Sequence, residues 1–331
     1  MQIYLIFFIF LFNLGLIPVA ISQETTSAVS GKIICLDPGH GGTAKTDSFR
    51  EGPTGEREEW INLRVALLLQ KMLEEKGAKV VMTRISDDTI SLSRRAQIAK
   101  ENNSDLFLSI HHNATADPKV NFPIIYFHGN ASENKASVIL GKEIGKALTE
   151  KLYEGSTPVS IVSDHVIFSR SGTGVLRGTY GIPGVIAEAS FFTNSGEEVR
   201  LKQTEYNRRE AFAYSVALEN YFKETIPPIQ EKNSIIEVSP FQAFYGAERM
   251  NKIALLWYED FIKGKELMKA DFKESLEEAY KLFTRSARSF PDSYVAADCH
   301  RYRADLLRKL GRAEEAQKEE QRVEEFYVPM K

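Results

Sequence analysis

Four side chains that can bind a metal ion or transfer a proton stand in separate segments of this 331-residue chain: His40, Glu58, His111 and Glu188. Two imidazoles and one carboxylate are the protein ligands of an open catalytic zinc site, in which water holds the fourth position. The metal in such a site polarises a carbonyl group and lowers the pKa of its water to about 7. A carboxylate outside the ligand set serves as the general base, so Glu188 would take the proton from that water and pass it to a departing amine.

Each of these residues also has a purely structural interpretation. His40 follows a Pro-Gly pair and could be an exposed turn residue, and His111 could be a strand-end histidine bonded to the backbone. Glu58 could be a first-turn acid that interacts favourably with a helix dipole. Glu188 is harder to explain in this way, because its neighbours are apolar and an unpartnered buried carboxylate is costly.

The placement of three of the four residues relative to predicted strands favours a common site. Short apolar runs at 32–36, 106–110 and 184–187 predict buried strands. His40, His111 and Glu188 come just after the carboxyl ends of these runs. Open α/β sheets bind their ligands at that edge. The polar loop 41–57 would bring Glu58 back to His40.

Strands that alternate with helices predict the fold class, an α/β domain with a mostly parallel twisted sheet flanked by helices. Ser91 is the predicted N-cap of one helix, and Gly77 is the predicted C-terminal stop of another. The segment 154–180, rich in Gly, Ser and Thr, is expected to be irregular and to lie over the site. The remaining predicted elements are helices at 58–76, 91–102, 132–152 and 205–222 and strands at 79–83 and 124–127.

Other chemistries are not indicated by the sequence. It has no Gly-x-Ser-x-Gly elbow and no Gly-rich phosphate loop, and neither Cys35 nor Cys299 lies in a Cys-His arrangement. A net charge of -3 argues against a nucleic-acid partner held by a basic surface. Cys35 lies in an apolar run and is predicted to be a buried free thiol, with a Cys35–Cys299 disulfide as the alternative in an oxidising compartment.

The N-terminal 22 residues predict export. The run from Ile3 to Ile21 is almost wholly apolar, and Ala20-Ile21-Ser22 offers small residues at the positions that a signal peptidase reads. An uncleaved membrane anchor is the alternative, since about 20 apolar residues span a bilayer. Either outcome places the protein in the periplasm or cell envelope. Residues 23–30 form a polar tether.

A change in composition at Pro227-Pro228 marks a linker at 225–240, after which residues 241–331 are expected to be helical throughout and to form a small all-α domain. Two similar stretches, around Ala279 and Ala316, recur after about 37 residues, which is close to the tetratricopeptide period. A plain helical hairpin is the alternative. We expect this helical region (residues 241–331) either to dock on the preceding domain or to offer an apolar groove to a protein partner. The linker suggests that a chain ending near Lys223 folds alone.

Residues 31 to about 224 resemble the zinc-dependent N-acetylmuramoyl-L-alanine amidases, which cut peptidoglycan between the glycan and its stem peptide. The resemblance rests on four motifs in the family's order, each holding one of the four residues above. They are Asp37-Pro38-Gly39-His40-Gly41-Gly42, Glu58 with Asn62-Leu63, Ser109-Ile110-His111-His112-Asn113, and Pro183-Gly184-Val185-Ile186-Ala187-Glu188. Thr83-Arg84, Leu92 to Ala96 and Val175-Leu176-Arg177 also fall in the family's order.

The resemblance implies one zinc ion per chain, with His40, Glu58 and His111 as ligands and Glu188 as general base and acid. Glu59, directly after Glu58, is the alternative carboxylate ligand.

Asn113 and Arg177, within the family motifs, and His165, in the segment rich in Gly and Ser, are candidate substrate contacts. Ser190 stands where the family usually has Gly. The interval from His111 to Glu188 is too short for the helical plug of some relatives, although 155–173 could form a small lid.

The resemblance, with the apolar N-terminal segment, implies an exported peptidoglycan hydrolase that cleaves the amide bond between N-acetylmuramic acid and the L-alanine of the stem peptide, in cell-wall remodelling or daughter-cell separation. Two alternatives remain open. One is a catalytically silent wall-binding or scaffold protein, which the retention of all four residues disfavours. The other is a zinc peptidase that acts within the stem peptide and shares every residue named above.

Overall fold

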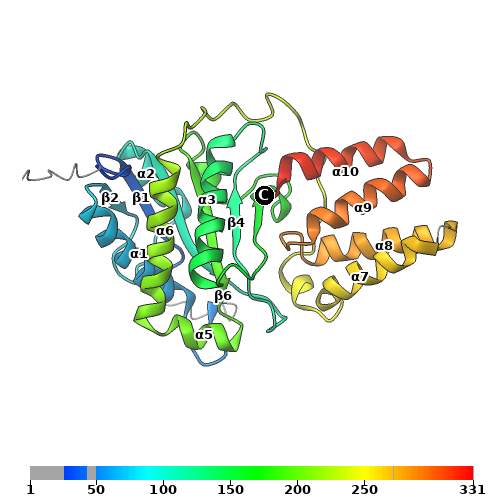
Figure 1. The fold of residues 1–331 in the computed structure, drawn as a ribbon, viewed down its shortest axis with the longest axis horizontal. Helices are drawn as coiled ribbons and strands as arrows, with labels where there is room; N and C mark the ends of the chain where they lie inside the picture. Colours follow the sequence, from blue (N-terminus) through cyan, green and yellow to red (C-terminus); the bar gives the residue numbers. More distant parts are fainter. Residues whose placement is uncertain (1–25, 43–49, 271, 331) are drawn as a thin grey trace, which may run out of the picture.

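The computed structural model describes residues 26–42, 50–270 and 272–330. The predicted signal segment 1–22 and the first part of the tether therefore lie outside the described residues. One mixed sheet forms the centre of the molecule, with helices beside it and the helices of the C-terminal third stacked at one end (Figure 1).

Seven strands form the sheet in the order β2-β1-β3-β6-β4-β5-β7. The first four are parallel to one another, β4 runs antiparallel to β6 and parallel to β5, and β7 runs antiparallel to β5. The predicted α/β class with a mostly parallel sheet is thus confirmed. The strands are β1 (Ile33–Pro38), β2 (Lys79–Met82), β3 (Leu106–Asn113), β4 (Ile124–Phe127), β5 (Ser160–Ser163), β6 (Gly184–Phe191) and β7 (Tyr327–Val328).

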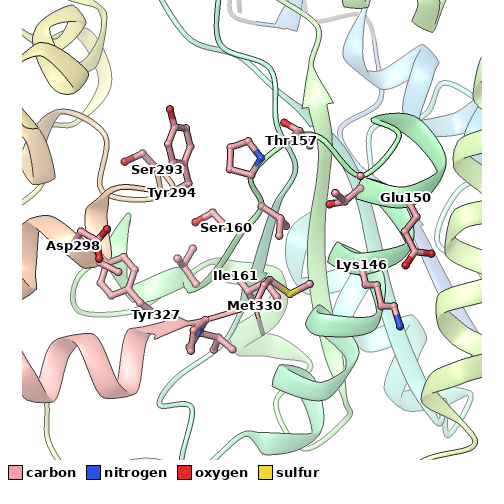
Figure 2. A pocket seen from close by; sticks show the side chains of 18 of the residues that line it. Lys146, Glu150, Thr157, Ser160, Ile161, Ser293, Tyr294, Asp298, Tyr327 and Met330 are labelled. Carbon is pink, nitrogen blue, oxygen red and sulfur yellow. The ribbon is translucent and has the colours of Figure 1, made fainter. Parts of the chain in front are cut away.

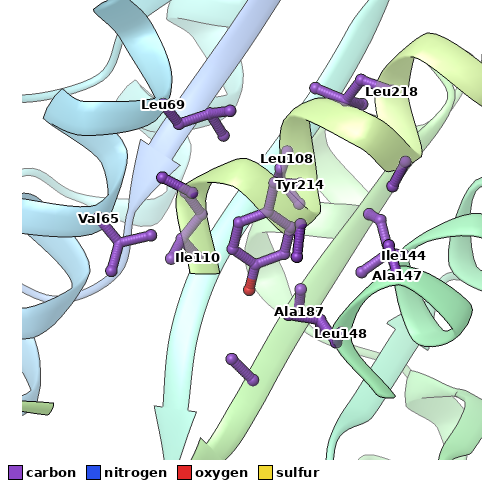
Figure 3. Close-up of a cluster of buried hydrophobic side chains, with 14 of the residues drawn as sticks. Val65, Leu69, Leu108, Ile110, Ile144, Ala147, Leu148, Ala187, Tyr214 and Leu218 are labelled. Carbon is purple, nitrogen blue, oxygen red and sulfur yellow. The ribbon is translucent and has the colours of Figure 1, made fainter. Parts of the chain in front are cut away.

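Three long helices cover one face of the sheet and bury the first hydrophobic core, part of which Figure 3 shows. They are α1 (Glu58–Glu75), α3 (Lys135–Leu152) and α6 (Thr204–Tyr221). Tyr214 of α6 lies between Ile110 of β3 and Ala187 of β6 in this core (Figure 3). The opposite face carries the shorter helices α2 (Leu92–Glu101) and α4 (Gly174–Gly178), whose apolar side chains join a second core. The short helix α5 (Ser195–Leu201) precedes α6.

The helix ends follow the signals in the sequence. Gly77 adopts a positive φ of 83° directly after α1, and Ala78 donates its backbone N–H to the carbonyl of Leu73, which is the predicted glycine stop. Ser91 accepts the backbone N–H of Arg94 at 3.2 Å, which confirms the predicted N-cap of α2.

The segment 154–180 is more regular than the sequence predicted. It contains the buried strand β5, a single 3₁₀ turn, η2 (Asp164–Val166), and the helix α4. The four-residue strand β5 has only two apolar residues, Ile161 and Val162, and is too short to be recognised by periodicity. It is stabilised by strands on both sides, β4 and β7.

The helical region contains two antiparallel helix pairs but is not helical throughout. Its C-terminal strand β7 adds to the edge of the sheet, with Tyr327 opposite Val162. The two-residue β7 has no signal of its own in the sequence. The helices are α7 (Trp257–Leu267), α8 (Lys273–Ser289), α9 (Ala296–Lys309) and α10 (Ala313–Phe326), with 3₁₀ turns η3 (Gly246–Met250), η4 (Ala254–Leu256) and η5 (Met268–Ala270).

The helical region docks on the sheet through the second core, on the face opposite α1, α3 and α6. Phe290 packs against Phe122 and Phe191, with ring centroids 5.9 and 6.2 Å apart. Phe326 and Tyr327 are buried in the same core, which also includes Ile124, Tyr126 and Val162 of the sheet. One of the two expected arrangements, docking on the preceding domain, is therefore the one observed.

The predicted linker 225–240 is held along the surface of the preceding domain. Gln230 donates its backbone N–H to the carbonyl of Glu133, and the side chain of Asn130 donates to the carbonyl of Ile236 at 2.7 Å. Together with the shared core, these contacts argue against the expectation that a chain ending near Lys223 folds alone.

Two further expectations concern the cysteines and the membrane. Cys35 is buried and free, as predicted, Cys299 is also buried and free, and the two form no disulfide. Among the helices that the structure describes, none has the length and hydropathy to cross a bilayer. Residues 1–25 are outside that observation.

Candidate metal site

Three of the four candidate residues converge at the carboxyl ends of β1 and β3. His40 lies two residues after β1, His111 lies two residues before the end of β3, and Glu58 is the first residue of α1. His40 Nε2 is 3.0 Å from Glu58 Oε2, and His111 Nδ1 is 2.9 Å from Glu58 Oε1. The two imidazole rings meet edge to face with their centroids 4.8 Å apart.

The geometry of this cluster fits a metal ion. Each residue offers one ligand atom, and these atoms lie within 4.8 Å of one another. Zinc bonds to imidazole nitrogen and carboxylate oxygen are about 2.0–2.2 Å long, so a small approach of the side chains brings all three atoms onto one ion. His40 and His111 are partly exposed whereas Glu58 is buried, which leaves the imidazole side of the cluster open.

The turn that carries His40 depends on glycine. A Cβ atom at Gly39 would lie 2.2 Å from His111 Nε2, so only glycine lets the turn approach the second imidazole. His40 itself has a positive φ of 59°, in the left-handed region that non-glycine residues rarely adopt. Backbone strain of this kind is held in place by surrounding contacts and is common at functional sites.

Two buried arginines hold the same turn from below. Arg84 donates to the carbonyls of Pro38 and Gly39 at 2.9 and 2.8 Å. Arg95 donates to the carbonyl of Pro38 and forms a 2.7 Å ion pair with Asp37, and it also contacts the carbonyl of His40. Both arginines lie in motifs that resemble those of the family, Thr83-Arg84 and Leu92 to Ala96, but this role was not predicted from the sequence.

A chain of hydrogen bonds from α6 reaches the carboxylate of Glu58. Glu210 lies 3.0 Å from His112 Nε2, and His112 Nδ1 lies 2.9 Å from Asn62 Oδ1. Asn62 then donates from Nδ2 to Glu58 Oε1 at 3.1 Å. All four are buried. His112, treated in the sequence as the variable position of its motif, therefore orients Glu58 from the opposite face of β3.

The alternative carboxylate, Glu59, points away from the cluster. Its Oε1 pairs with Arg57 at 2.6 Å, and the side chain is fully buried. Glu58, and not Glu59, contacts the two imidazoles.

Neighbouring charge favours the ligand form of Glu58, and burial favours that of His111. Burial raises the pKa of Glu58, but the charge of His40 and hydrogen bonds with His111 and His40 outweigh it, so the pKa of Glu58 lies well below its ordinary value. Burial lowers the pKa of His111, against the opposing effect of Glu58. A carboxylate and a neutral imidazole are the protonation states that a metal requires.

Glu188 lies beside the cluster on the neighbouring strand. Its Cα is paired with that of His111 across β3 and β6, and the two side chains share one face of the sheet. Glu188 Oε2 is buried and has no hydrogen-bond partner. Burial, then the charges of Glu58 and Asp292, raise the pKa of Glu188 well above its ordinary value. Asp292 belongs to the helical region, where it bonds the hydroxyl of Tyr126 on β4.

A cavity of about 230 Å³ opens over His40 and His111. Arg95 lines its floor, and Val175 of α4 lines one wall. A larger cavity of about 730 Å³ lies near the other edge of the sheet, between α3 and α9, and holds none of the four candidate residues (Figure 2). The smaller cavity is the one lined by two of the candidate ligands, His40 and His111.

The three candidate substrate contacts do not share that cavity. Arg177 and His165 line a separate cavity of about 200 Å³ on the other side of α4. Arg177 donates to the carbonyl of Ser171 at 2.9 Å. Asn113 ends β3, and its side-chain oxygen accepts the backbone N–H of Ala114. Ser190, the departure from the family pattern, lies fully buried in β6, in the stretch between Glu188 and Phe191 where the register with β3 shifts by one residue.

Comparison with known proteins agrees with this geometry. The model of the N-acetylmuramoyl-L-alanine amidase family matches residues 34–220. The amidase AmiA of Salmonella typhimurium is 27% identical over 231 residues, covering 60% of this chain and 79% of that protein.

Two solved structures share the fold at 25% identity. The amidase AmiC2 of Nostoc punctiforme covers 59% of this chain and 99% of its own, with a TM-score of 0.50. The CwlD amidase of Clostridioides difficile, solved in complex with the GerS lipoprotein, covers 58% of this chain and 99% of its own, with a TM-score of 0.51. The family match includes His40, Glu58, His111 and Glu188. The chain thus belongs to the N-acetylmuramoyl-L-alanine amidases, the enzymes that hydrolyse the amide bond between N-acetylmuramic acid and L-alanine in peptidoglycan.

Proposed function

We propose that this amidase is zinc-dependent, with His40 Nε2, the Glu58 carboxylate and His111 Nδ1 as the ligands of one zinc ion and Glu188 as the general base and acid. The observation that carries the proposal is the convergence of the three ligand atoms within 4.8 Å beside Glu188. Two imidazoles and one carboxylate match the ligand set of catalytic zinc sites.

A zinc ion bound there would polarise the lactyl carbonyl of the substrate and lower the pKa of a water molecule to about 7. Asn62 and His112 keep the Glu58 carboxylate turned toward both imidazoles, so the ligand atoms are arranged before any ion binds.

Glu188 is placed to move the proton. Its unpartnered Oε2 accepts a proton from the attacking water while the water oxygen bonds to the lactyl carbonyl carbon. As the carbon–nitrogen bond breaks, the same carboxyl group passes the proton to the departing nitrogen of L-alanine. Charges of Glu58 and Asp292 favour the protonated form of Glu188, and a divalent cation offsets them.

Stem peptides carry free carboxylates, and cationic groups flank the site. Arg177 lines the cavity beside α4 together with Arg170, Lys232 and His165. We propose Arg177 as the contact to a stem-peptide carboxylate, since a guanidinium pairs well with carboxylates. Asn113, at the end of β3, is the other candidate contact.

The setting of the enzyme follows from its substrate. Peptidoglycan lies outside the cytoplasm, so the apolar N-terminal segment fits export to the periplasm or cell envelope, with cleavage or anchoring as the two outcomes. The proposed role is cell-wall remodelling or daughter-cell separation. The helical region, tetratricopeptide-like in its spacing, exposes Tyr258 and Ile262 on α7 and Phe272 just before α8, which offer an apolar surface to a protein partner.

Digestion of purified peptidoglycan tests the proposal. The account predicts stem peptides with a free L-alanine amino group and glycan chains with intact lactyl groups, identified by mass spectrometry, and loss of this activity in a chelator with recovery on zinc addition. Fragments cut within the stem peptide would instead indicate a zinc peptidase. No cleavage by the zinc-loaded protein would indicate a silent wall-binding protein.

A further inference from the structure

A second group of two imidazoles and a carboxylate lies beyond the carboxyl ends of β4 and β5. His128 directly follows β4, and Asp164 and His165 form the turn η2 directly after β5. These two strands are parallel neighbours, with Phe127 opposite Ser163, so the three side chains are brought together by the sheet. None of them belongs to the first cluster or to the motifs that carry the family resemblance.

The distances within this group suit a divalent ion. His128 Nδ1 lies 3.0 and 2.9 Å from the two oxygens of Asp164, and His165 Nε2 lies 4.0 Å from Asp164 Oδ1. One ligand atom from each residue lies within 4.8 Å of the others. Tetrahedral zinc with bonds of about 2.1 Å separates its ligand atoms by about 3.4 Å. A small movement of His165 toward Asp164 therefore satisfies the geometry.

The group contains buried nitrogen atoms without a partner. His128 and Asp164 are 1% and 0% exposed. The Nε2 atoms of His128 and His165 are both buried and make no hydrogen bond within the described residues. In His165 this is the nitrogen next to Asp164, whereas His128 meets Asp164 through Nδ1. Buried polar atoms are rarely left in this state, because the lost hydrogen bond costs free energy. At 4.0 Å from Asp164, His165 Nε2 is too far for a hydrogen bond but close enough to share an ion.

The surroundings fix the group in place. Thr173 donates its backbone N–H and its hydroxyl to Asp164 Oδ2 at 2.7 and 2.8 Å. Ser163 donates to the carbonyl of Gly129, next to His128, at 2.7 Å. A Cβ atom at Gly172 would lie 2.5 Å from Asp164 Oδ1 and 2.6 Å from His128 Cε1, so the loop closes tightly over one side. Such supporting contacts are typical of metal ligands that are oriented in advance.

We propose that His128, Asp164 and His165 form a second metal site, selective for Zn²⁺ or a similar divalent transition-metal ion, distinct from the site of His40. Two imidazole nitrogens and one carboxylate oxygen favour such an ion over Mg²⁺ or Ca²⁺, which prefer oxygen ligands.

The ion would fasten the segment from Asp164 to Thr173 onto the end of β4. Thr173 is the residue that precedes α4, and Val175 of α4 lines the cavity above His40. The second site would therefore fix the position of α4, which lines the first cavity.

Zinc stoichiometry of the full-length protein, stripped of metal with a chelator and then reloaded with zinc, tests the inference. We expect two zinc ions per chain in the native protein, one in His40→Ala, one in His165→Gln and none in the double variant, measured by atomic emission after gel filtration. Arg170→Gln, an exposed change in the same segment, is the control and should keep two. One ion in the native protein, with one in His165→Gln and none in His40→Ala, overturns the second site and leaves the first intact.

Thermal unfolding supplies a readout that is independent of activity. Added zinc should raise the melting temperature of His40→Ala and should not raise that of the double variant, because an ion that binds only the folded state stabilises it. An unchanged melting temperature of His40→Ala with zinc contradicts the proposal. Should His165→Gln fail to fold without metal, this zinc-dependent shift in His40→Ala alone decides the question.

Discussion

His111 of β3 and Glu188 of β6 stand directly opposite each other in the register of two parallel strands. Paired residues of adjacent strands project to the same face, so a proposed metal ligand and the proposed base are held side by side by backbone hydrogen bonds of the sheet. Glu58, from α1, completes the group at 2.9 Å from His111. The proposed roles of the two glutamates, Glu58 as metal ligand and Glu188 as general base, follow from this arrangement and can be distinguished by experiment.

Glu188→Gln should retain zinc but lose most turnover, by about two to four orders of magnitude, because an amide cannot accept the proton of the attacking water. Glu58→Gln should lose zinc affinity together with activity. Zinc content and the rate of muropeptide cleavage distinguish the two. Glu59→Gln is the matched control on the adjacent residue and should keep its zinc. Zinc loss in Glu59→Gln and not in Glu58→Gln would show that the ligand was misassigned.

Asn62→Ala should weaken zinc binding by about 10- to 100-fold while leaving the three ligands in place, because Asn62 links His112 to the Glu58 carboxylate. Competition with a chelating dye measures the affinity. Gln70→Ala, which removes a hydrogen bond to Glu74 on the solvent side of the same helix, should bind zinc as the native chain does. Equal affinities in the two variants would mean that the bond chain from α6 does not support the metal site.

A chain ending at Lys223 should be insoluble or much less stable than the full chain. It exposes Phe122, Tyr126 and Phe191, which pack against the helical region, and leaves β5 without β7. Burial of each large apolar side chain contributes about 1.5–3 kcal/mol, which together is comparable to the whole stability of a domain. Solubility and thermal melting test this.

Point variants make the same test without truncation. Phe290→Ser, at the contact with Phe122 and Phe191, should lower the melting temperature strongly, whereas Phe272→Ser, at a half-exposed position, should leave it nearly unchanged. Two results would together show that the helical region is a separable module: a truncated chain that stays folded and active, and a melting temperature that Phe290→Ser lowers only slightly.

The stability of the helical region should fall as pH drops from about 6.5 to about 4. Burial, against the opposing effect of Glu319, lowers the pKa of His300 to about 4. Between these pH values the unfolded chain binds a proton on His300 and the folded chain does not, so acid favours unfolding, by up to about 3 kcal/mol. Melting temperatures across this range should fall less steeply in His300→Gln. Parallel pH profiles for both proteins would contradict the assignment.

The sequence was sufficient to predict the convergence of His40, Glu58 and His111, because the ends of parallel strands meet at one edge of a sheet. The predicted strands ended too early, since His111 and Glu188 lie within β3 and β6 and do not follow them. Local signals also predicted the helix ends at Gly77 and Ser91, since glycine and serine act there through their own backbone or side chain.

Features that depend on distant contacts were not predicted. Two-residue β7 exists only because β5 offers it an edge, and β5 is too short to show a periodicity. The bond chain from Glu210 through His112 to Asn62 joins three segments that have no common sequence signal. The docking of the helical region likewise depends on aromatic contacts such as Phe290 with Phe122, and a change in composition at Pro227 does not reveal them.

The most direct test of the central claim is a crystal structure of the zinc-loaded protein, with anomalous diffraction recorded on both sides of the zinc absorption edge. The account predicts an anomalous peak about 2.0–2.2 Å from His40 Nε2, a Glu58 carboxylate oxygen and His111 Nδ1, next to Glu188. The peak at this position should be absent from crystals of His111→Ala. A zinc-loaded, active protein with no peak among these three side chains would contradict the account.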